Sequence, residues 1–325
     1  MHRGITAVLA CGTAAAAVLV AGPAHAAGTY SAFVFSNGST QPQIYTFIKS
    51  ATRTLDMTMY ELSDTTAEND LIAQKKAGVT VRVILDRTRT SVNDAAYSKL
   101  SAAGVGVVWS SSAYVYTHQK TITVDGTESL ILSGNLTSKY YSTGVDYGVF
   151  DNDPTDVSAI ERVFNADYKH SSVTPSDGDN LLWSPTDAES RLLSVINGAT
   201  TTLDVEEEEF SDTALTDAIA ARAAAGVTVR VVVEDPSSYA SEVSDVDSSG
   251  GSVAGYSGST GTYIHAKAIV ADYGLSTQQV EVGSMNFSTN SVGSNRELGI
   301  ILTDQAVADT IENHFNGDFA NGTPE

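Results

Sequence analysis

Two short segments, far apart in the chain, carry the same set of reactive side chains. Each has a histidine, a lysine two residues later and an aspartate five residues after the lysine, in the sequences HQKTITVD and HAKAIVAD. The residues are His118, Lys120 and Asp125 in the first segment and His265, Lys267 and Asp272 in the second. Because side chains two residues apart on a strand point to the same face, each histidine is expected to lie beside its lysine.

A turn that contains asparagine, and then an acidic residue, follow each segment. The first turn, LSGN at 132–135, precedes Asp146, and the second, GSMN at 283–286, precedes Glu297. Lysine charges and asparagine amides can hold a phosphate diester and stabilise the negative charge that develops on it. The residues predicted for this role are Lys120, Lys267, Asn135, Asn286, Ser133 and Ser284. The two acids can accept the second ring N–H of the histidines and fix their tautomer.

Two histidines at one phosphorus atom would be enough for hydrolysis. One imidazole can attack phosphorus while the other protonates the leaving oxygen, and water activated by the second can then cleave the phosphohistidine. A neutral histidine beside a protonated one predicts a bell-shaped pH profile centred at ~6–7. No tight cluster of histidine, cysteine and carboxylate side chains stands out in the sequence, so neither a metal nor a cofactor is expected.

An internal repeat supplies the elements that would bring the two segments together. Residues 51–86 match residues 199–234 at a constant shift of 148, and AGVTVRV at 77–83 recurs at 225–231. A seven-residue identity inside a longer match is hard to assign to chance. The sequence therefore predicts two related halves.

Each copy of the repeat predicts a strand, a helix and a second strand. In the first copy the strand spans 54–60, Ser63-Asp64 starts a helix over about 65–77, and Gly78 ends it. The β-branched run that follows suits a buried parallel strand, which completes a βαβ unit. With the further strands that follow in both copies, we expect an α/β fold of two similar halves with mixed, largely parallel sheets related by a pseudo-twofold axis.

The N-terminal residues have the pattern of a secretory signal. Arg3 precedes an apolar run at 5–21, and Ala24-His25-Ala26 resembles a cleavage site. Residues 1–26 are therefore predicted to be removed and the protein to be secreted. A membrane anchor is the rival interpretation, but the apolar run is short for a span. A lipoprotein signal at Cys11 is disfavoured because the apolar run continues past the cysteine.

The rest of the chain is predicted to divide at a segment rich in serine, proline and glycine. This segment, at about 170–182, would separate a first half (27–172) from a second half (173–325). Without the leader and its Arg3, 17 basic residues stand against 39 acidic ones, a net charge of −22. Such a charge argues against binding to nucleic acid, which depends on neutralising phosphates with lysine and arginine.

Taken together, the duplicated motifs resemble the phospholipase D superfamily. The resemblance rests on HxKxxxxD in both halves, the GSMN turn and the acid after each turn, and it covers nearly all of the mature chain. It implies that His118 forms the covalent intermediate and that His265 is the general acid and base. It also implies that Asp146 and Glu297 orient the histidines, whereas Asp125 and Asp272 are structural. The first turn departs from the family pattern, because Leu132 stands where glycine is usual.

Four consecutive glutamates, Glu206–Glu209, interrupt the second copy of the repeat. One interpretation is a solvated strand end. The other uses the repeat, in which Glu61 and Glu209 are equivalent and lie where α/β clefts open. These two carboxylates could then receive a cationic headgroup such as choline or ethanolamine.

The leading hypothesis is a secreted phospholipase D that hydrolyses phospholipids at a membrane or micelle surface, with headgroup exchange where an alcohol replaces water. A secreted metal-independent nuclease is the first alternative, with Arg82, Arg87 and Arg89 as the nearest basic residues. A non-catalytic lipid-binding protein is the second alternative. No obligate protein partner is expected, because the repeat makes a monomer self-sufficient.

Overall fold

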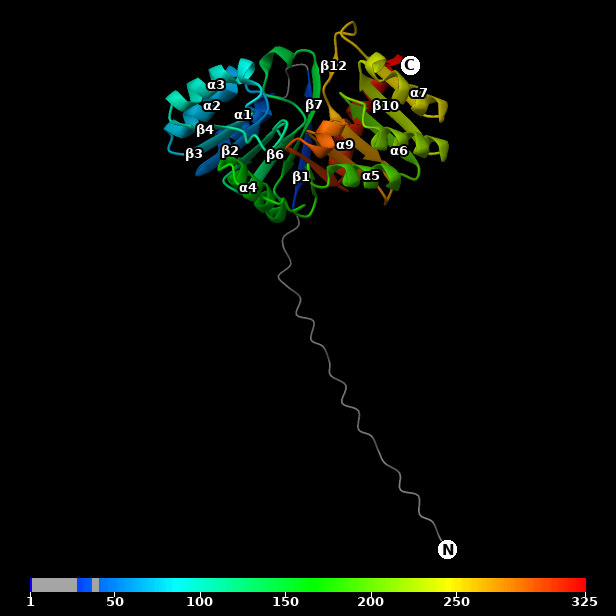
Figure 1. The fold of residues 1–325 in the computed structure, drawn as a ribbon, viewed down its shortest axis with the longest axis horizontal. Helices are drawn as coiled ribbons and strands as arrows, with labels where there is room; N and C mark the ends of the chain where they lie inside the picture. The colour runs from blue at the N-terminus through cyan, green and yellow to red at the C-terminus, as the bar shows by residue number, and fades with distance from the viewer. Residues whose placement is uncertain (2–27, 37–40) are drawn as a thin grey trace.

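The computed structural model describes Met1, residues 28–36 and residues 41–325. The predicted leader and its cleavage site at Ala26 lie outside the described residues. Within the ranges that are described, no helix has both the length and the apolar character to cross a bilayer. The described chain forms two α/β halves that lie side by side (Figure 1).

A mixed sheet forms the centre of each half. The strands of the first half are β1 (Tyr30–Ser36), β2 (Thr54–Met59), β3 (Thr80–Leu85), β4 (Gly106–Trp109), β5 (Thr121–Val124), β6 (Glu128–Leu132) and β7 (Gly144–Asp151). Those of the second are β8 (Leu181–Ser184), β9 (Thr202–Glu207), β10 (Thr228–Glu234), β11 (Ser252–Tyr256), β12 (Tyr263–Ile264), β13 (Lys267–Ala271), β14 (Gln279–Gly283), β15 (Glu297–Leu302) and β16 (Thr323–Pro324).

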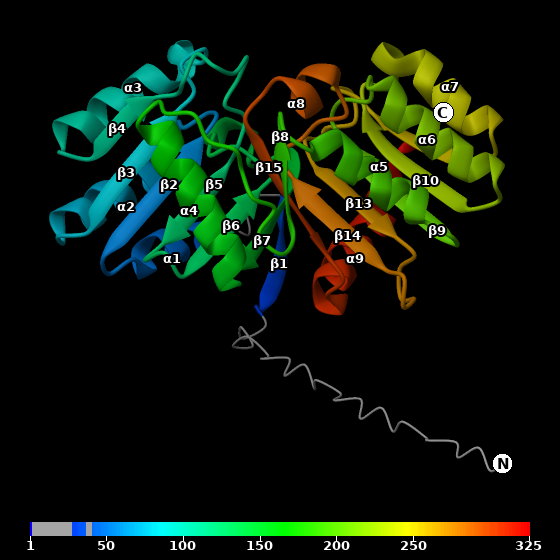
Figure 2. The same ribbon diagram turned by 60° about the horizontal axis from the view of Figure 1, so that its bottom comes forward.

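Helices cover both faces of the two sheets. They are α1 (Gln41–Ser50), α2 (Thr65–Lys76), α3 (Thr90–Ala102), α4 (Pro154–Tyr168), α5 (Ala188–Gly198), α6 (Thr213–Ala224), α7 (Ala240–Ser248), α8 (Thr289–Gly293) and α9 (Gln305–Asn321), with short 3-10 turns at Ser138–Tyr140 and Pro236–Tyr239. Helices α1 to α3 cover one face of the first sheet and α5 to α7 the corresponding face of the second. Helices α4 and α9 lie on the opposite faces, near the junction of the halves (Figure 2).

The two sheets have the same strand order. The first runs β1-β7-β6-β5-β2-β3-β4, and the second runs β8-β15-β14-β13-β9-β10-β11, with β16 added at its edge. The register repeats as well, since Thr54 lies opposite Thr80 in the first half and Thr202 opposite Thr228 in the second. The prediction of two similar α/β halves with mixed sheets is confirmed.

The expectation that parallel pairing would dominate is wrong. In the first half β2, β3 and β4 are parallel, whereas β5, β6, β7 and β1 pair antiparallel. The reason is the connection after the βαβ unit, where the chain returns through hairpins. Asp125 and Gly126, both with positive φ (54° and 65°), form the tight turn between β5 and β6, and such turns join antiparallel strands.

The βαβ units form for the reasons that their sequence suggests. The Asp64 carboxylate accepts hydrogen bonds from the Thr66 and Ala67 N–H groups at 2.8 and 3.2 Å and so caps α2. Gly78 follows the helix with a φ of +98°, a conformation that glycine adopts without strain. Asp212 caps α6 in the same way through the Leu215 N–H.

The two halves share part of their hydrophobic core. Val145, Tyr147 and Val149 of β7 belong to the same buried cluster as Val282 of β14 and Ile300 of β15. Close-packed interiors resist rearrangement, so this cluster fixes one half against the other. Residues at the junction are therefore held in a defined geometry before any substrate binds.

Candidate active site

Each motif histidine enters the site on a segment that pairs with the opposite half. Thr117, just before His118, bridges to Arg296, and the His118 N–H donates to the Arg296 carbonyl at 3.0 Å. Before His265, β12 pairs in parallel with β7, and the His265 N–H donates to the Val145 carbonyl at 3.1 Å. Both crossing segments end at the junction of the halves, so both histidines line one cavity there.

The sequence predicts each histidine and its lysine on one strand, but only Lys267, the first residue of β13, lies on a strand. His118 and Lys120 precede β5, and His265 lies in the break between β12 and β13. Each lysine instead folds back on its own motif, because Lys120 Nζ donates to the His118 carbonyl at 2.6 Å and Lys267 Nζ donates to the His265 carbonyl. Both lysines are buried.

The acid partner of each histidine comes from the other half. Glu297 Oε2 lies 2.9 Å from His118 Nδ1, and Asp146 Oδ1 lies 2.8 Å from His265 Nδ1. A carboxylate at Nδ1 favours the tautomer with the proton on that nitrogen and leaves Nε2 for chemistry. The sequence predicted these two acids for this position but did not assign which acid serves which histidine.

Further side chains hold the two acids in place. Ser133 Oγ donates to Asp146 Oδ1 at 2.7 Å, and Asn295 Nδ2 donates to Glu297 Oε1 at 2.9 Å. The Ser284 hydroxyl bonds with the Leu298 backbone, and its carbonyl lies 3.0 Å from His118 Nδ1. The expectation that the hydroxyls of Ser133 and Ser284 contact phosphate is therefore corrected, because these fully buried groups are used inside the protein.

The two predicted asparagines do line the cavity, as do both histidines. Asn135 Oδ1 accepts a hydrogen bond from the Glu61 N–H at 3.3 Å, which orients its amide. The Asn286 Oδ1 is buried and has no partner among the residues that the structure describes. An amide without a partner at the cavity wall is available to a ligand.

The glutamates that interrupt the repeat are not a solvated strand end. Glu206 and Glu207 are buried on β9, and burial raises the pKa of both well above the ordinary value. Glu206 accepts a hydrogen bond from the Tyr147 hydroxyl across the junction of the halves. The solvated interpretation is thus wrong, because partners distant in sequence compensate the buried carboxyl groups.

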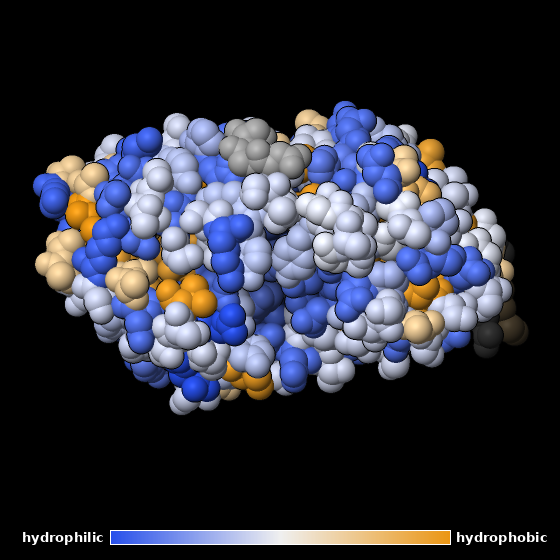
Figure 3. Space-filling model, turned by 90° about the horizontal axis from the view of Figure 1, so that it is seen from above, coloured by the Kyte–Doolittle hydropathy of each residue, from blue (hydrophilic) through white to orange (hydrophobic). Residues whose placement is uncertain are grey.

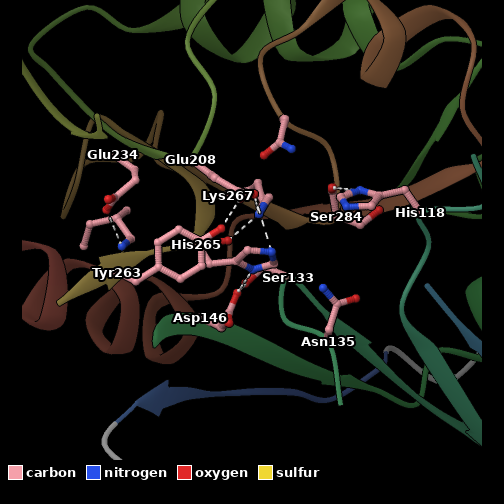
Figure 4. Close-up of polar contacts among 12 residues, drawn as sticks. His118, Ser133, Asn135, Asp146, Glu208, Glu234, Tyr263, His265, Lys267 and Ser284 are labelled. Carbon is pink, nitrogen blue, oxygen red and sulfur yellow. Dashed lines mark hydrogen bonds and ion pairs between the residues drawn. The ribbon is translucent and has the colours of Figure 1, made fainter. Parts of the chain in front are cut away.

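Glu208 is the site residue that the sequence analysis missed. Its Oε2 lies 2.7 Å from Lys267 Nζ and 3.4 Å from His265 Nε2, and its Oε1 accepts from the Tyr263 hydroxyl (Figure 4). Burial opposes its ionisation, but the charges of His265 and Lys267 outweigh burial and hold the pKa of Glu208 below its usual range. The repeat gave a signal, since Glu208 stands at the shift of 148 from Tyr60, directly after strand β9.

The two residues predicted for a cationic headgroup differ in their surroundings. Both Glu61 and Glu209 line the cavity. Glu61, however, is paired with Arg89, whose Nε donates to Glu61 Oε1 at 2.6 Å. Of these two carboxylates, Glu209 alone has no ion-pair partner among the described residues, so the two positions are not equivalent in charge.

The cavity has a volume of about 220 Å³ and opens in a hollow between the halves (Figure 3). Hydrophilic side chains surround this hollow on the face that the figure shows. Four tyrosines line the cavity together with the acids and histidines: Tyr60, Tyr140, Tyr141 and Tyr263. The wall thus combines imidazole, amide and carboxylate groups with aromatic rings.

The motif aspartates lie away from the cavity and act on the backbone. The Asp125 carboxylate accepts hydrogen bonds from the N–H groups of Thr52, Arg53 and Thr54. Burial works against its ionisation, yet these hydrogen bonds hold the pKa of Asp125 at about 2. Asp272 makes the same contacts to Thr200 and Thr201. Both geometries fit the structural role that the sequence analysis gave them.

Among the described residues, no group of histidine, cysteine and acidic side chains could hold a metal ion. Two imidazoles and two amides line the cavity, and each motif lysine is buried behind the wall with its Nζ on the carbonyl of its own histidine. Groups of this kind suit nucleophilic attack on a phosphate diester, protonation of a leaving oxygen and stabilisation of the developing charge.

A family model described as cardiolipin synthase, PLD-like domain matches this chain twice, over residues 44–168 and 192–319. Together the two matches cover well over half of the chain, one in each half of the fold. No curated protein sequence gives a significant match.

Solved structures share the fold at low sequence identity. Polyphosphate kinase from Porphyromonas gingivalis superposes with a TM-score of 0.69 at 13% identity, over 89% of this chain. The chain spans half the length of that kinase. Phosphatidylserine synthase from Haemophilus influenzae Rd KW20 gives a TM-score of 0.69 at 12% identity and covers 91% of this chain and 87% of its own.

Proposed function

This chain belongs to the cardiolipin synthase, phospholipase D-like domain family, and from that premise we propose that it hydrolyses the headgroup phosphodiester of phospholipids through a phosphohistidine. The observation that carries the proposal is the pair of motif histidines, whose acids are crossed: each histidine is bonded to an acid of the opposite half. Each has an acid at Nδ1, and both line one cavity. One structural neighbour is a phosphatidylserine synthase, which supports a lipid phosphodiester as the substrate class.

In the first step, His118 Nε2 attacks phosphorus, so that a P–N bond forms and the P–O bond to the headgroup breaks. Glu297 accepts the Nδ1–H of His118 and stabilises the positive charge on the ring. His265 gives its proton to the leaving headgroup oxygen. This step releases the headgroup alcohol and leaves a phosphatidyl group on His118.

In the second step, His265 Nε2 takes a proton from water, and the water oxygen attacks phosphorus. The P–N bond to His118 then breaks and phosphatidic acid leaves. An alcohol in place of water would give a new diester by the same route, which is headgroup exchange. Lys120 and Asn135 stabilise the extra charge on the phosphate oxygens in both steps.

The headgroup part of the proposal is a zwitterionic lipid such as phosphatidylcholine or phosphatidylethanolamine. The free carboxylate of Glu209 and the cavity tyrosines support a cationic headgroup, because cations are attracted to acids and to aromatic faces. Nucleic acid is a poorer substrate because a chain of net charge −21 repels its phosphates. The acidic residues of the cavity wall do not reduce this repulsion.

A substrate panel without added metal tests this proposal. We expect turnover of phosphatidylcholine and phosphatidylethanolamine, measured as released headgroup, and none of DNA. In Glu209→Gln, the ratio of choline lipid to phosphatidylglycerol cleavage should fall about threefold to tenfold, since one charge–cation contact is lost. DNA cleavage by the wild type without lipid turnover would show the nuclease instead, and an unchanged ratio in Glu209→Gln would remove Glu209 from the headgroup site.

The pH dependence of kcat/KM follows from two buried groups. Burial lowers the pKa of His118, so this histidine stays neutral, and able to attack, to a lower pH than an exposed histidine. Burial also lowers the pKa of Lys120 to about 7, so its positive charge is present below that pH and is lost as the pH rises through it. We therefore expect kcat/KM to fall above pH ~7.

Lys120→Arg provides the check, because arginine keeps its charge at every pH in this range. In this variant the alkaline fall should move to higher pH, whatever the cost to the maximal rate. An alkaline limb at the same pH in both proteins would assign that limb to another group.

Secretion through the predicted leader is also part of the proposal. Expression of the full chain with its leader should give an extracellular protein that starts at Ala27, which N-terminal sequencing would detect.

A further inference from the structure

The two halves differ at one cavity position that the repeat makes equivalent. At the shift of 148, Tyr60 of the first half corresponds to Glu208 of the second, and both line the cavity. The Tyr60 ring packs edge-on against His118 at 4.5 Å and lies 5.2 Å from Lys120 Nζ. Glu208 takes the same place beside His265 and Lys267, but with a negative charge.

This charge lies where a phosphate oxygen would be bound. A phosphate held by the second half would put an oxygen within hydrogen-bond distance of Lys267 Nζ and next to His265 Nε2. Glu208 Oε2 makes these contacts in the structure, at 2.7 and 3.4 Å. The Tyr263 hydroxyl donates to the second carboxylate oxygen of Glu208. The Glu208 side chain is only 20% exposed, so the carboxylate is held by the protein rather than solvated.

The first half has no such occupant. Lys120 Nζ bonds only to the His118 carbonyl among the described residues, and His118 Nε2 has no partner there. The cavity thus has one open and one filled phosphate position.

We propose that Glu208 is an internal occupant of the second half's phosphate position, which an anionic ligand must displace from Lys267 and His265. This inference rests on the proposed function, since it concerns the same site. When substrate binds, its phosphate meets Lys120 and His118 first, and the released Glu208 carboxylate lies on the side of the leaving headgroup. A leaving group with a positive charge or hydrogen-bond donors is then favoured over one that carries another phosphate.

The test measures binding of inorganic phosphate, and of sulfate, by calorimetry at constant pH and ionic strength. In Glu208→Gln the side chain keeps its shape but competes less, because a neutral amide is a weaker partner for lysine than a carboxylate. We expect both anions to bind about tenfold to a hundredfold more tightly than to the wild type. Glu209→Gln removes an equal charge from the same wall without touching Lys267, and should change the affinity by less than about threefold.

The opposite outcome has a definite meaning. If Glu208 only positions Lys267, Glu208→Gln will bind the anions equally or more weakly, and the proposal is overturned. Equal gains in Glu208→Gln and Glu209→Gln would also overturn it, because they would show a general charge effect. Glu208→Ala, checked by circular dichroism for folding, repeats the measurement without any side chain able to reach the lysine.

Anion binding is measured without turnover, so it separates this inference from the proposed function. Tighter phosphate binding in Glu208→Gln with no lipid hydrolysis by the wild type would support the inference and reject the function. Lipid hydrolysis with unchanged phosphate affinity in Glu208→Gln would do the reverse.

Discussion

Replacing His118 with alanine should lower the rate of phosphodiester hydrolysis by about 10⁴-fold or more, because the nucleophile itself is removed. The loss should be the same for a lipid and for a p-nitrophenyl phosphodiester, since both need attack on phosphorus. Neither substrate should label the variant, whereas the wild type, quenched during turnover, should carry on His118 the phosphoryl ester that remains after the leaving group departs, which is a phosphatidyl group when the substrate is a lipid. Mass spectrometry of the quenched protein would detect this adduct.

His265→Ala should behave differently with the two substrates. A headgroup alkoxide needs a proton to leave, so lipid hydrolysis should fall about 10²-fold to 10⁴-fold. The p-nitrophenolate ion leaves without one, so formation of the adduct on His118 should survive and the adduct should accumulate. His170→Asn is the matched control, because this exposed histidine has a φ of +52°, which asparagine tolerates, and lies outside the cavity. An adduct on His265 in the wild type would exchange the two roles.

Glu297→Gln should lower kcat by about 10³-fold and act on His118 rather than on the histidine of its own half. The amide of glutamine has no negative charge with which to accept the Nδ1–H of His118. It can donate to Nδ1 instead, which favours the tautomer with the proton on Nε2, where the attacking lone pair is needed. Because Glu297 raises the pKa of His118 against the larger effect of burial, its loss should lower that pKa further. Histidine resonances followed by NMR through a pH titration would show the change at His118 and none at His265.

Asp146→Asn is the partner experiment on the other crossed pair. It should alter the His265 resonances only and lower lipid hydrolysis more than p-nitrophenyl ester cleavage. If instead Glu297→Gln perturbed His265 and Asp146→Asn perturbed His118, the crossed arrangement would be wrong. Ser133 and Asn295 donate to the two acids, and the oxygen of an isosteric amide can accept the same bonds, so the fold around each substitution can remain.

Much of the fold could be predicted because the repeat encodes it locally. The Asp64 cap, the Gly78 turn and the β-branched run after it act within a few residues, so the βαβ units were predictable. The dominance of antiparallel pairs was not predicted, although the Asp125-Gly126 turn gave a signal for a hairpin. A tight turn of this kind joins antiparallel strands, so the strands after the βαβ unit pair antiparallel.

The candidate site was predictable in its residues but not in its pairing. Spacing along a chain shows which side chains share a face, but it carries no information on which half supplies the partner. His118 and its partner Glu297 are 179 residues apart in the sequence, and only the tertiary fold brings them together. The prediction that Glu206–Glu209 form a solvated strand end was wrong for a related reason, because it rested on charge alone. Tyr147 donates a hydrogen bond to Glu206, and Lys267 pairs with Glu208, inside the protein.

The crossing of β12 onto β7 has a consequence for the origin of the molecule. Because each half supplies the acid for the other half's histidine, the site needs both halves, and its pseudo-symmetry is that of a homodimer of one short chain. Fusion of two gene copies would keep the shared centre and end the requirement that both copies mutate together. After the fusion one copy could keep a tyrosine, Tyr60, where the other acquired a glutamate, Glu208. The two sides of a formerly symmetric site could then take different roles.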